Sequence, residues 1–299
     1  MQTQTLWMLL ILTSAPLCAR AQWLHNPTPG TPRAPDGKPN LAARAPRTSN
    51  GKPDLTGVWL AEPASIEELM RMAPAGVSAL GEGLPSKYFV NILADFKPED
   101  APLLPAAAES YRQHLQSAGK DFQTSRCLPA GVPAANLLPI PFKLIQTPQQ
   151  IVLLYEADTT FRQIFTDGRK LPDDPQPSWL GYSVGRWEGD WMVVDSAGFN
   201  DKAWLDAFGH IHSDALRVTE RFHRRDFGHM QAEVRLDDPK TFTKPVTVRF
   251  NLDLIPDTEL LETFCPESEK DLKLAERLIS LPYFLPNYSE FGPFCAMLG

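Results

Sequence analysis

Residues 181–200 constrain the fold of this chain more than any other segment. Residues 182–187 read as one extended stretch, and residues 191–195 read as a second stretch rich in β-branched and aromatic side chains. Between them, residues 188–190 supply a turn, because Gly189 can adopt a positive φ without a Cβ clash. The segment therefore predicts a β-hairpin with a Trp on each side of its turn.

Similar patterns flank this hairpin and predict further strands. They cover residues 142–146, 151–157, 160–166, 215–224, 229–236, 245–254 and 259–264. With the hairpin they give about eight or nine antiparallel strands, a number that can close into a barrel around one small ligand. We therefore expect an all-β fold, an antiparallel β-barrel with helical insertions.

The start of the ordered region supports a particular kind of barrel. Residues 54–59 read Asp-Leu-Thr-Gly-Val-Trp, and a Gly-x-Trp of this kind resembles the first strand of lipocalin-like barrels. In such barrels the Trp closes one end, which implies the same position for Trp59.

The composition and the N-terminal segment indicate where the protein is located and which classes of partner it can bind. Residues 1–21 resemble a secretory signal peptide, with an apolar centre at residues 6–12 and Ala19-Arg20-Ala21 before the cleavage point. This predicts a secreted or periplasmic protein. The net charge is −7 without a basic run, which argues against nucleic-acid binding. No later apolar run reaches the roughly 18 residues that span a bilayer.

The remaining chain divides into a leader and one domain. Residues 22–53 form a Pro-rich leader, in which Gly-Lys-Pro occurs at residues 37–39 and again at 51–53. Residues 54–299 form a single β-barrel domain. It carries a helical insertion at residues 60–125, with helices expected at 66–72 and 102–116, the second capped by Asp100. A C-terminal extension at residues 266–299 contains a further helix at 269–279.

Export makes disulfides possible. After signal cleavage three cysteines remain, Cys127, Cys265 and Cys295. We predict that Cys127 pairs with Cys265, because this bond would tie the region before the sheet to its last strand. Three buried free thiols remain the alternative.

Four motifs resemble a family of secreted bacterial proteins. They are the start at residues 54–59, the Asp-Gly-Arg turn at 167–169, the Gly-x-Ser-x-Gly-x-Trp-Glu-Gly-Asp hairpin at 181–190 and the His-Ser-x-x-Leu-x-Val-x-Glu-Arg-Phe strand at 212–222. Trp191-Met192 departs from the Thr-Leu usual in this family, and the resemblance implies no particular activity. Ser183 also fits a nucleophile-elbow pattern, but that motif needs a strand–turn–helix context rather than a hairpin.

Alternation along residues 216–224 places one acid on an apolar face. Glu220 shares this face with Leu216 and Val218, where an ionised carboxylate needs a partner or takes a raised pKa. It is a candidate acid or base. The alternative is a buried Glu–Arg pair that fixes the strand register, with Arg162 or Arg221 as the partner.

The loop at residues 199–213 concentrates further polar groups. Asp206, His210 and His212 lie within it beside Trp204. His212 is a candidate acid–base residue together with Glu220, provided that the loop folds back over the mouth of the barrel. Both His residues with Asp206 or Glu220 could hold a metal, but hydrogen bonding and capping are the simpler roles.

We therefore expect an exported enzyme that performs cofactor-free acid–base chemistry of the lyase, hydratase or isomerase type. Its substrate would be a small, partly apolar organic molecule. His212, Glu220, Arg221 and Arg162 would be catalytic, without metal or cofactor. The residues expected to line the substrate site are Tyr155, Trp204, Asp206, His210 and Tyr182. The alternatives are a lipocalin-like ligand-binding protein and a structural domain that binds a partner.

Overall fold

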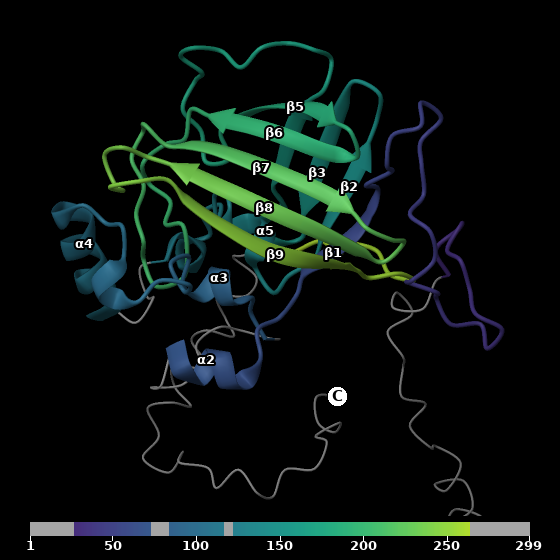
Figure 1. Cartoon of the computed structure of the whole chain (residues 1–299), viewed down its shortest axis with the longest axis horizontal. Helices are drawn as coiled ribbons and strands as arrows, with labels where there is room; N and C mark the ends of the chain where they lie inside the picture. Colours follow the sequence, from purple (N-terminus) through teal and green to yellow (C-terminus); the bar gives the residue numbers. More distant parts are fainter. Residues whose placement is uncertain (1–26, 73–83, 117–121, 264–299) are drawn as a thin grey trace, which may run out of the picture. The chain divides into compact units, whose positions relative to one another are not determined.

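The computed structural model describes residues 27–72, 84–116 and 122–263. Within these residues, nine strands close into a barrel, and β1 pairs with β9 to complete it (Figure 1). The strands are β1 (Gly57–Ala61), β2 (Phe142–Gln146), β3 (Gln150–Tyr155), β4 (Phe161–Phe165), β5 (Tyr182–Glu188), β6 (Trp191–Ala197), β7 (Arg217–Arg224), β8 (His229–Asp237) and β9 (Val246–Leu254). The all-β barrel predicted from the sequence is confirmed.

The central hairpin is present as predicted. β5 and β6 pair from Tyr182↔Ala197 to Glu188↔Trp191. Gly189, which lies between them, has a φ of 62°, a value that L-residues with a Cβ rarely adopt. The turn at residues 188–190 thus sets the register of the β5–β6 pair.

One strand pair differs from the expected architecture. β4 and β5 run parallel, and only Ile164↔Ser183 and Phe165↔Val184 are in register. The prediction of a purely antiparallel barrel was therefore wrong, and the barrel is mixed. The physical reason is the length of the connection at residues 166–181. It is long enough to return to the end of the barrel at which β4 begins, so that β5 can run in the same direction as β4. A tight turn would have forced the antiparallel alternative.

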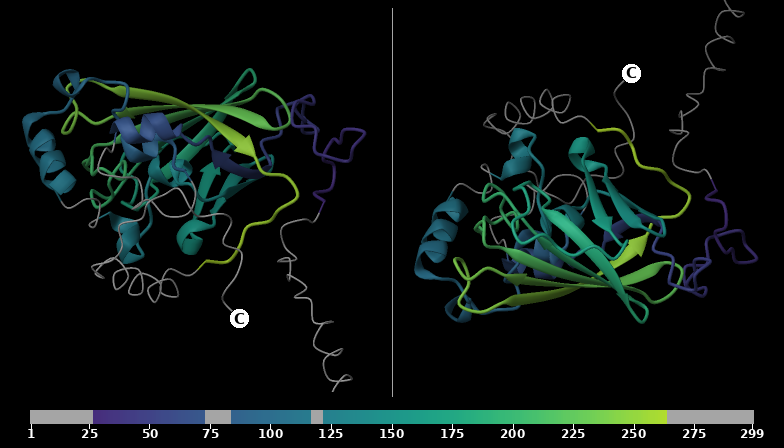
Figure 2. Two further views of the ribbon diagram at one scale, coloured as in Figure 1. Left: turned by 90° about the horizontal axis from the view of Figure 1, so that it is seen from below. Right: turned by 90° about the horizontal axis from the view of Figure 1, so that it is seen from above.

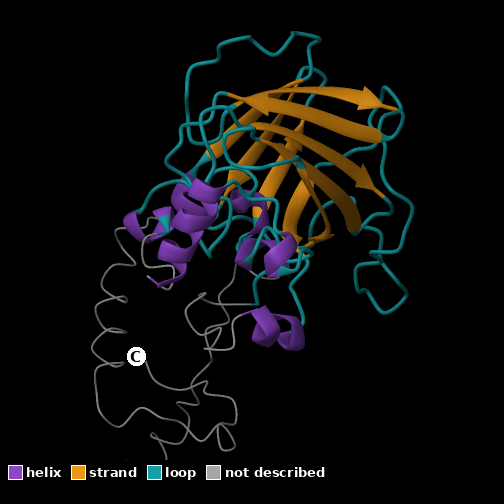
Figure 3. Cartoon of the chain, turned by 60° about the vertical axis from the view of Figure 1, so that its left-hand side comes forward, coloured by secondary structure: helices purple, strands orange, loops and turns teal. Residues whose placement is uncertain are grey.

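Short helices gather at one end of the barrel (Figure 3). They are α2 (Ile66–Met72), α3 (Lys87–Val90), α4 (Pro105–Gln116) and α5 (Ala134–Leu137), with 3-10 turns η2 (Pro98–Asp100), η3 (Gln123–Arg126) and η4 (Ala157–Thr159). The α2 prediction is confirmed. The second helix begins at Pro105, because proline suits a first turn that has no intrahelical N–H to satisfy. Asp100 lies in η2 and does not cap it, contrary to expectation.

Trp59 belongs to the opposite end of the barrel. It is fully buried, and its indole N–H donates to the Leu55 carbonyl oxygen at 2.9 Å. The Arg224 guanidinium lies over the ring, 5.0 Å from its centroid, and donates to the carbonyl oxygens of Asp54 and Thr56 at 2.6 and 3.2 Å. An aromatic ring under a cation whose N–H groups are satisfied closes this end without leaving a buried donor unpaired.

The leader runs along this closed end, away from α4 (Figures 1 and 2). Its two Gly-Lys-Pro copies fold alike, with an isolated antiparallel bridge Arg33↔Pro39 in the first and Arg47↔Pro53 in the second. Main-chain bonds also join the leader to the β7–β8 turn, where the N–H groups of Phe227 and Gly228 donate to Ala43 and Leu41. The described part of the leader, residues 27–53, is thus ordered and held against the barrel.

The described residues end at 263, shortly after β9. Residues 259–263 do not form the last strand that was predicted, because β1 already occupies the free edge of β9. The predicted signal peptide at residues 1–21, the predicted helix at 269–279 and the rest of the predicted extension at 266–299 lie outside the described residues. None of the described helices has the length and apolar character needed to cross a membrane.

Inward-facing side chains alternate along the strands and fill the barrel. On β7, Val218, Glu220 and Phe222 face inward, and on β9 Val248, Phe250 and Leu252 do so. The helical end contributes Phe89, Phe122 and Leu137 to the same apolar core. Charged side chains are rare in such an apolar interior, because burial of an unpaired charge is costly.

Candidate functional site

A buried ion pair lies inside the barrel. Arg162 on β4 and Glu220 on β7 are 2% and 0% exposed, and Arg162 Nη2 donates to Glu220 Oε2. Both side chains reach the interior because each occupies an inward position of its strand. Charges in such a setting are tolerated only when they are paired and hydrogen bonded. The buried Glu–Arg pair that the sequence suggested as an alternative is therefore present, with Arg162 as the partner of Glu220.

Two serines extend the network from the Arg162 side. Arg162 Nε donates to Ser183 Oγ at 3.1 Å, and Nη2 donates to Ser196 Oγ at 2.8 Å. The two hydroxyl oxygens lie 2.9 Å apart. Ser183 and Ser196 face each other because they are paired in the β5–β6 register. Ser183 therefore accepts a hydrogen bond from Arg162 and lies on a strand of a hairpin, whereas a nucleophile elbow requires a strand–turn–helix context.

An amide and a phenol extend the network from the Glu220 side. Asn136 on α5 donates through Nδ2 to Glu220 Oε1 at 3.1 Å, and the Tyr155 hydroxyl donates to Asn136 Oδ1 at 2.7 Å. Asn136 and Tyr155 are also buried, at 1% and 4% exposure. Both carboxylate oxygens of Glu220 are thereby engaged, one by a cation and one by an amide.

The low polarity of the surroundings controls the ionisation of this cluster. Burial raises the pKa of Tyr155, and the nearby positive charge of Arg162 offsets that effect only in part. Burial opposes the charged form of Arg162, but attraction to Glu220 and the hydrogen bond between them outweigh it and raise the pKa of Arg162. The cluster accordingly holds a neutral phenol beside a charged guanidinium.

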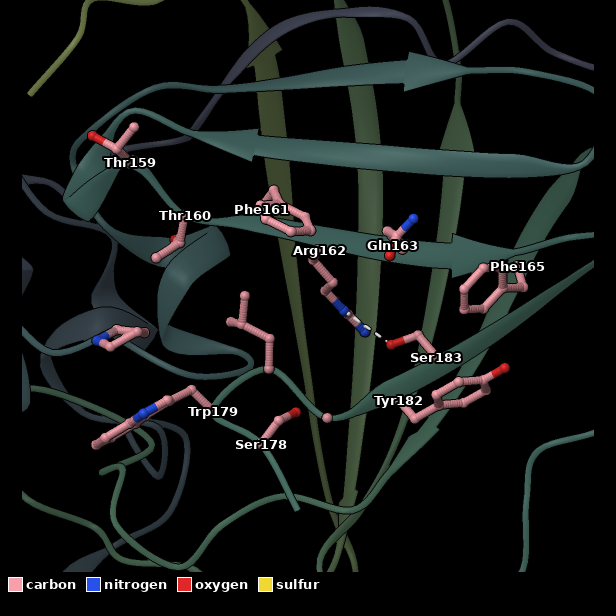
Figure 4. Close-up of a pocket in the computed structure, with 13 residues that line it drawn as sticks. Thr159, Thr160, Phe161, Arg162, Gln163, Phe165, Ser178, Trp179, Tyr182 and Ser183 are labelled. Carbon is pink, nitrogen blue, oxygen red and sulfur yellow. Dashed lines mark hydrogen bonds between the residues drawn. The ribbon is translucent and has the colours of Figure 1, made fainter. Parts of the chain in front are cut away.

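A pocket of about 470 Å³ opens beside Arg162, between β4 and the segment that leads into β5 (Figure 4). Its lining is mainly aromatic and apolar, and includes Phe161, Phe165, Trp179, Leu180 and Tyr182. Arg162 and Ser183 are the members of the buried network that also line it. The pocket lies where β4 and β5 are paired over only two positions, because the start of β4 is paired with β3 on one side but not with β5 on the other.

One nitrogen of the Arg162 guanidinium lacks a partner. Nε and Nη2 are engaged by Ser183, Ser196 and Glu220, whereas Nη1 is buried and has no hydrogen-bond partner among the described residues. Tyr155 also interacts with this guanidinium and raises the pKa of Arg162, and its hydroxyl oxygen can accept a hydrogen bond while its hydrogen is donated to Asn136.

Asp206 organises the loop at residues 199–213. Its Oδ1 accepts from the N–H groups of Gly209 and His210 at 2.9 and 3.1 Å, and its Oδ2 accepts from the Ile92 N–H at 2.6 Å. His210 Nδ1 lies 2.5 Å from the same Oδ2. The His210 ring stacks on Tyr111 of α4 with centroids 3.9 Å apart. The structure thus places Asp206 and His210 in a buried loop anchor, outside the pocket lining.

Trp204 and His212 occupy other parts of this loop. The Trp204 ring stacks on His114 with centroids 4.1 Å apart, and His212 Nδ1 lies 2.9 Å from the Ser213 carbonyl oxygen. His212 is 5% exposed, and burial lowers its pKa below the ordinary value of 6.5. Its hydrogen-bond partner and those of Glu220 belong to separate networks within the described residues. The expected pairing of His212 with Glu220 is therefore not formed by direct contact.

The remaining predicted residues divide between the two faces of the barrel wall. Arg221 points outward, where Nη1 lies 3.4 Å from Glu188 Oε2 and the guanidinium covers Trp191. Tyr182 lines the pocket, stacks on Phe165 and accepts a hydrogen bond from Arg169 at 3.0 Å. In the described part of the chain, no group of three or more His, Cys, Asp or Glu side chains is arranged to hold a metal ion. The partner predicted for Cys127, Cys265, lies outside the described residues.

Sequence reasoning missed Asn136, Ser196 and the aromatic lining supplied by Phe161 and Trp179. Ser196 could have been found, because it occupies an inward position two residues from Val194 on β6. Asn136 carried no such signal, since it lies on a single-turn helix between prolines. Comparisons with family models, curated proteins and solved structures gave no match.

Proposed function

We propose that this protein binds a small, largely apolar organic molecule in the pocket between β4 and β5. The observation that carries the proposal is the combination of an aromatic lining with one buried, charged hydrogen-bond donor, Arg162. Ligand sites in proteins commonly combine apolar walls with a few convergent polar groups. The proposal includes export to the periplasm or the medium, which rests on the signal-like residues 1–21.

The hydrogen bonds to Glu220 favour a binding function over a catalytic one. A general base needs a free oxygen within reach of its substrate. Here Arg162 and Asn136 engage both carboxylate oxygens, and Glu220 is not among the residues that line the pocket. His212, the other expected proton carrier, bonds to Ser213 instead.

An acid–base enzyme of the lyase, hydratase or isomerase type is the second candidate. The observation that favours it is the continuity of the network, since Arg162 and Ser183 line the pocket and connect through hydrogen bonds to Glu220 and Tyr155. A molecule bound against Arg162 would therefore lie one group away from a carboxylate and a phenol. Loss of turnover in Glu220→Gln without loss of ligand affinity would favour this candidate.

The binding proposal is tested with a neutral fluorescent probe, N-phenyl-1-naphthylamine, titrated into the purified protein. We expect saturable binding that Phe161→Ala weakens several-fold. Phe161 is 62% exposed, so its removal should leave the fold intact. Ile145→Ala is the matched control, because Ile145 is an exposed apolar side chain that does not line the pocket. Equal affinities for the wild type and Phe161→Ala would place the probe elsewhere and count against the proposal.

A further inference from the structure

Residues 178–181, which lead into β5, are held away from β4. The Ser178 N–H donates to the Gly198 carbonyl oxygen, just after β6, at 2.9 Å. Gly181 has a φ of 66°, and a Cβ at this position would lie 2.7 Å from the Phe199 ring. The segment therefore follows the chain after β6 rather than β4, and Figure 4 shows it diverging from β4 on one side of the pocket.

The register between β3 and β4 determines where the main-chain groups of β4 point. The Tyr155 N–H donates to the Thr160 carbonyl oxygen at 2.9 Å, and the Thr166 N–H donates to the Gln149 carbonyl oxygen at 2.8 Å. In an antiparallel pair, alternate residues of a strand bond to the same neighbour. The even-numbered residues of β4 therefore bond to β3, and the N–H and C=O groups of its odd-numbered residues point the opposite way.

Two of these main-chain groups lie beside the pocket. β5 comes into register with β4 only at Ile164, so the Phe161 carbonyl oxygen and the Gln163 N–H precede the paired stretch. Among the described residues, no main-chain hydrogen bond reaches either group. Phe161 and Gln163 both line the pocket. This edge of β4 thus presents an acceptor and, two residues later, a donor.

This arrangement selects a particular edge on a ligand. In a parallel sheet, a carbonyl oxygen and the N–H two residues later bond to the N–H and C=O of a single residue on the next strand. A small molecule offers the same two groups when a donor and an acceptor lie side by side. The main-chain groups of a strand lie near the plane of the sheet, whereas its side chains stand roughly perpendicular to it. A flat molecule can therefore meet them with its edge while its faces contact side chains.

We propose that the pocket takes planar heteroaromatic compounds whose edge carries an N–H donor beside an acceptor, as in a lactam or an aminoazine. The donor bonds to the Phe161 carbonyl oxygen, and the acceptor receives the Gln163 N–H. The faces of the ring pack against the apolar lining, which includes Trp179 and Leu180. The proposal rests on the binding function proposed above and names the ligand class of that same pocket.

Three bicyclic probes of matched shape test the ligand class. They are isocarbostyril, which has the lactam edge, isocoumarin, in which a ring oxygen replaces the N–H, and naphthalene, which lacks both groups. Ligand-observed NMR measures their affinities. We expect isocarbostyril to bind about tenfold more tightly than isocoumarin, because the lactone sets its ring oxygen against the Phe161 carbonyl oxygen and leaves that acceptor unsatisfied.

Gln163→Pro tests the main-chain donor. It removes the N–H at this position, and because that N–H has no partner in the sheet, no hydrogen bond of the barrel wall is lost with it. We expect Gln163→Pro to lose affinity for isocarbostyril but not for naphthalene. Gln163→Ala is the matched control, since it truncates the same side chain and keeps the N–H, and it should bind both probes as the wild type does.

Hydrogen exchange in the wild type gives a second readout that does not depend on the folding of a proline variant. Saturating isocarbostyril should slow exchange of the Gln163 amide. The Arg162 amide, which already bonds to β3, should keep its rate and serves as the control.

The possible outcomes separate the two proposals. Equal binding of isocarbostyril and isocoumarin, or unchanged exchange of the Gln163 amide, would refute recognition by the edge of β4 and leave the pocket as a binding site. Absence of binding by all three probes and by the fluorescent probe would overturn the proposed function itself.

Discussion

Arg47 of the leader holds Asp190, the last residue of the β5–β6 turn, through two parallel hydrogen bonds. Nη1 donates to Oδ1 at 3.0 Å and Nη2 donates to Oδ2 at 2.6 Å. The same Arg47 donates to the Gly51 carbonyl oxygen at 2.8 Å, which fixes its own turn. The first copy repeats this arrangement, since Arg33 contacts Asp257 and the Gly37 carbonyl oxygen. Two copies of one short motif thus attach the leader to the barrel in the same way.

This geometry predicts how the leader responds when one attachment is lost. Asp190→Ala should accelerate tryptic cleavage after Arg44 and Arg47, because the second copy loses its bidentate partner. The melting temperature should barely change, since both side chains are accessible to water. Mass spectrometry of a timed digest measures the rates. Asp237→Ala is the control, because Asp237 pairs with Arg235 outside the leader. Identical digests for Asp190→Ala and the wild type would contradict the proposed attachment.

The buried ion pair should be costly to break from one side. Glu220→Gln removes the negative charge that faces Arg162, and we expect the free energy of unfolding to fall by about 3–5 kcal/mol. Urea denaturation followed by Trp fluorescence measures the change. Arg221→Gln, at the next position but on the outer face, should cost less than about 1 kcal/mol. A similar small cost for Glu220→Gln would mean that the interior is more polar than the structure indicates.

His212 should make stability depend on pH in a defined direction. Its pKa in the folded chain lies below its ordinary value of 6.5, because burial disfavours the charged ring. Above pH 6.5 both folded and unfolded chains carry it neutral. Below that value the unfolded chain takes up a proton that the folded chain refuses, so stability decreases as the pH falls.

Substitution of His212 isolates this contribution. His212→Asn should flatten the fall in melting temperature just below pH 6.5, while its amide can still donate to the Ser213 carbonyl oxygen. His223→Asn, on the outer face beside Trp191, serves as the control and should retain the wild-type slope. An unchanged slope in His212→Asn would assign the pH dependence to other groups.

Asp206 should control the order of the loop at residues 199–213. Asp206→Ala removes one acceptor from three backbone N–H groups and from His210. We expect a loss of about 3–5 kcal/mol, since hydrogen bonds to a buried charge contribute roughly 1.5–3 kcal/mol each and are not additive. Hydrogen exchange should show the amides of Gly209 and His210 exposed first. Protection equal to the wild type in these amides would refute the anchor role.

The disulfide prediction stands on the sequence and is open to a direct test. Peptide mapping of the exported protein without reduction should show Cys127 linked to Cys265, with Cys295 carrying a free thiol. Loss of that bond should cost roughly 2–5 kcal/mol. A peptide that links Cys295 to either residue would show that the pairing is wrong.

Strand periodicity made much of the barrel predictable. The alternation on β7 placed Glu220 inward and Arg221 outward, and the structure has both so. The turn at Gly189 and the inward position of Arg162 followed from the same local rules. These features depend on neighbours within one strand or one turn, which a sequence displays directly.

The features that could not be predicted depend on the path of long connections. Residues 166–181 are compatible with either direction of β5, and only packing selects the parallel one. His212 and Glu220 were expected to meet on the assumption that the loop folds back over the barrel mouth. The structure instead shows that Asp206 holds this loop to the backbone of Ile92, which no spacing in residues 199–213 reveals.

The parallel junction of β4 and β5 has one more consequence. A closed barrel normally has no edge strand, so every main-chain N–H and carbonyl group along its wall is committed to a neighbour. Because the register joins only Ile164 and Phe165 to β5, residues 161–163 have β3 as a paired neighbour on one side and no paired strand on the other. At three residues it is too short to recruit a foreign strand, and it borders the hollow that Arg162 lines. The barrel thereby keeps one short stretch with a paired neighbour on one side only, without the aggregation hazard of an open sheet.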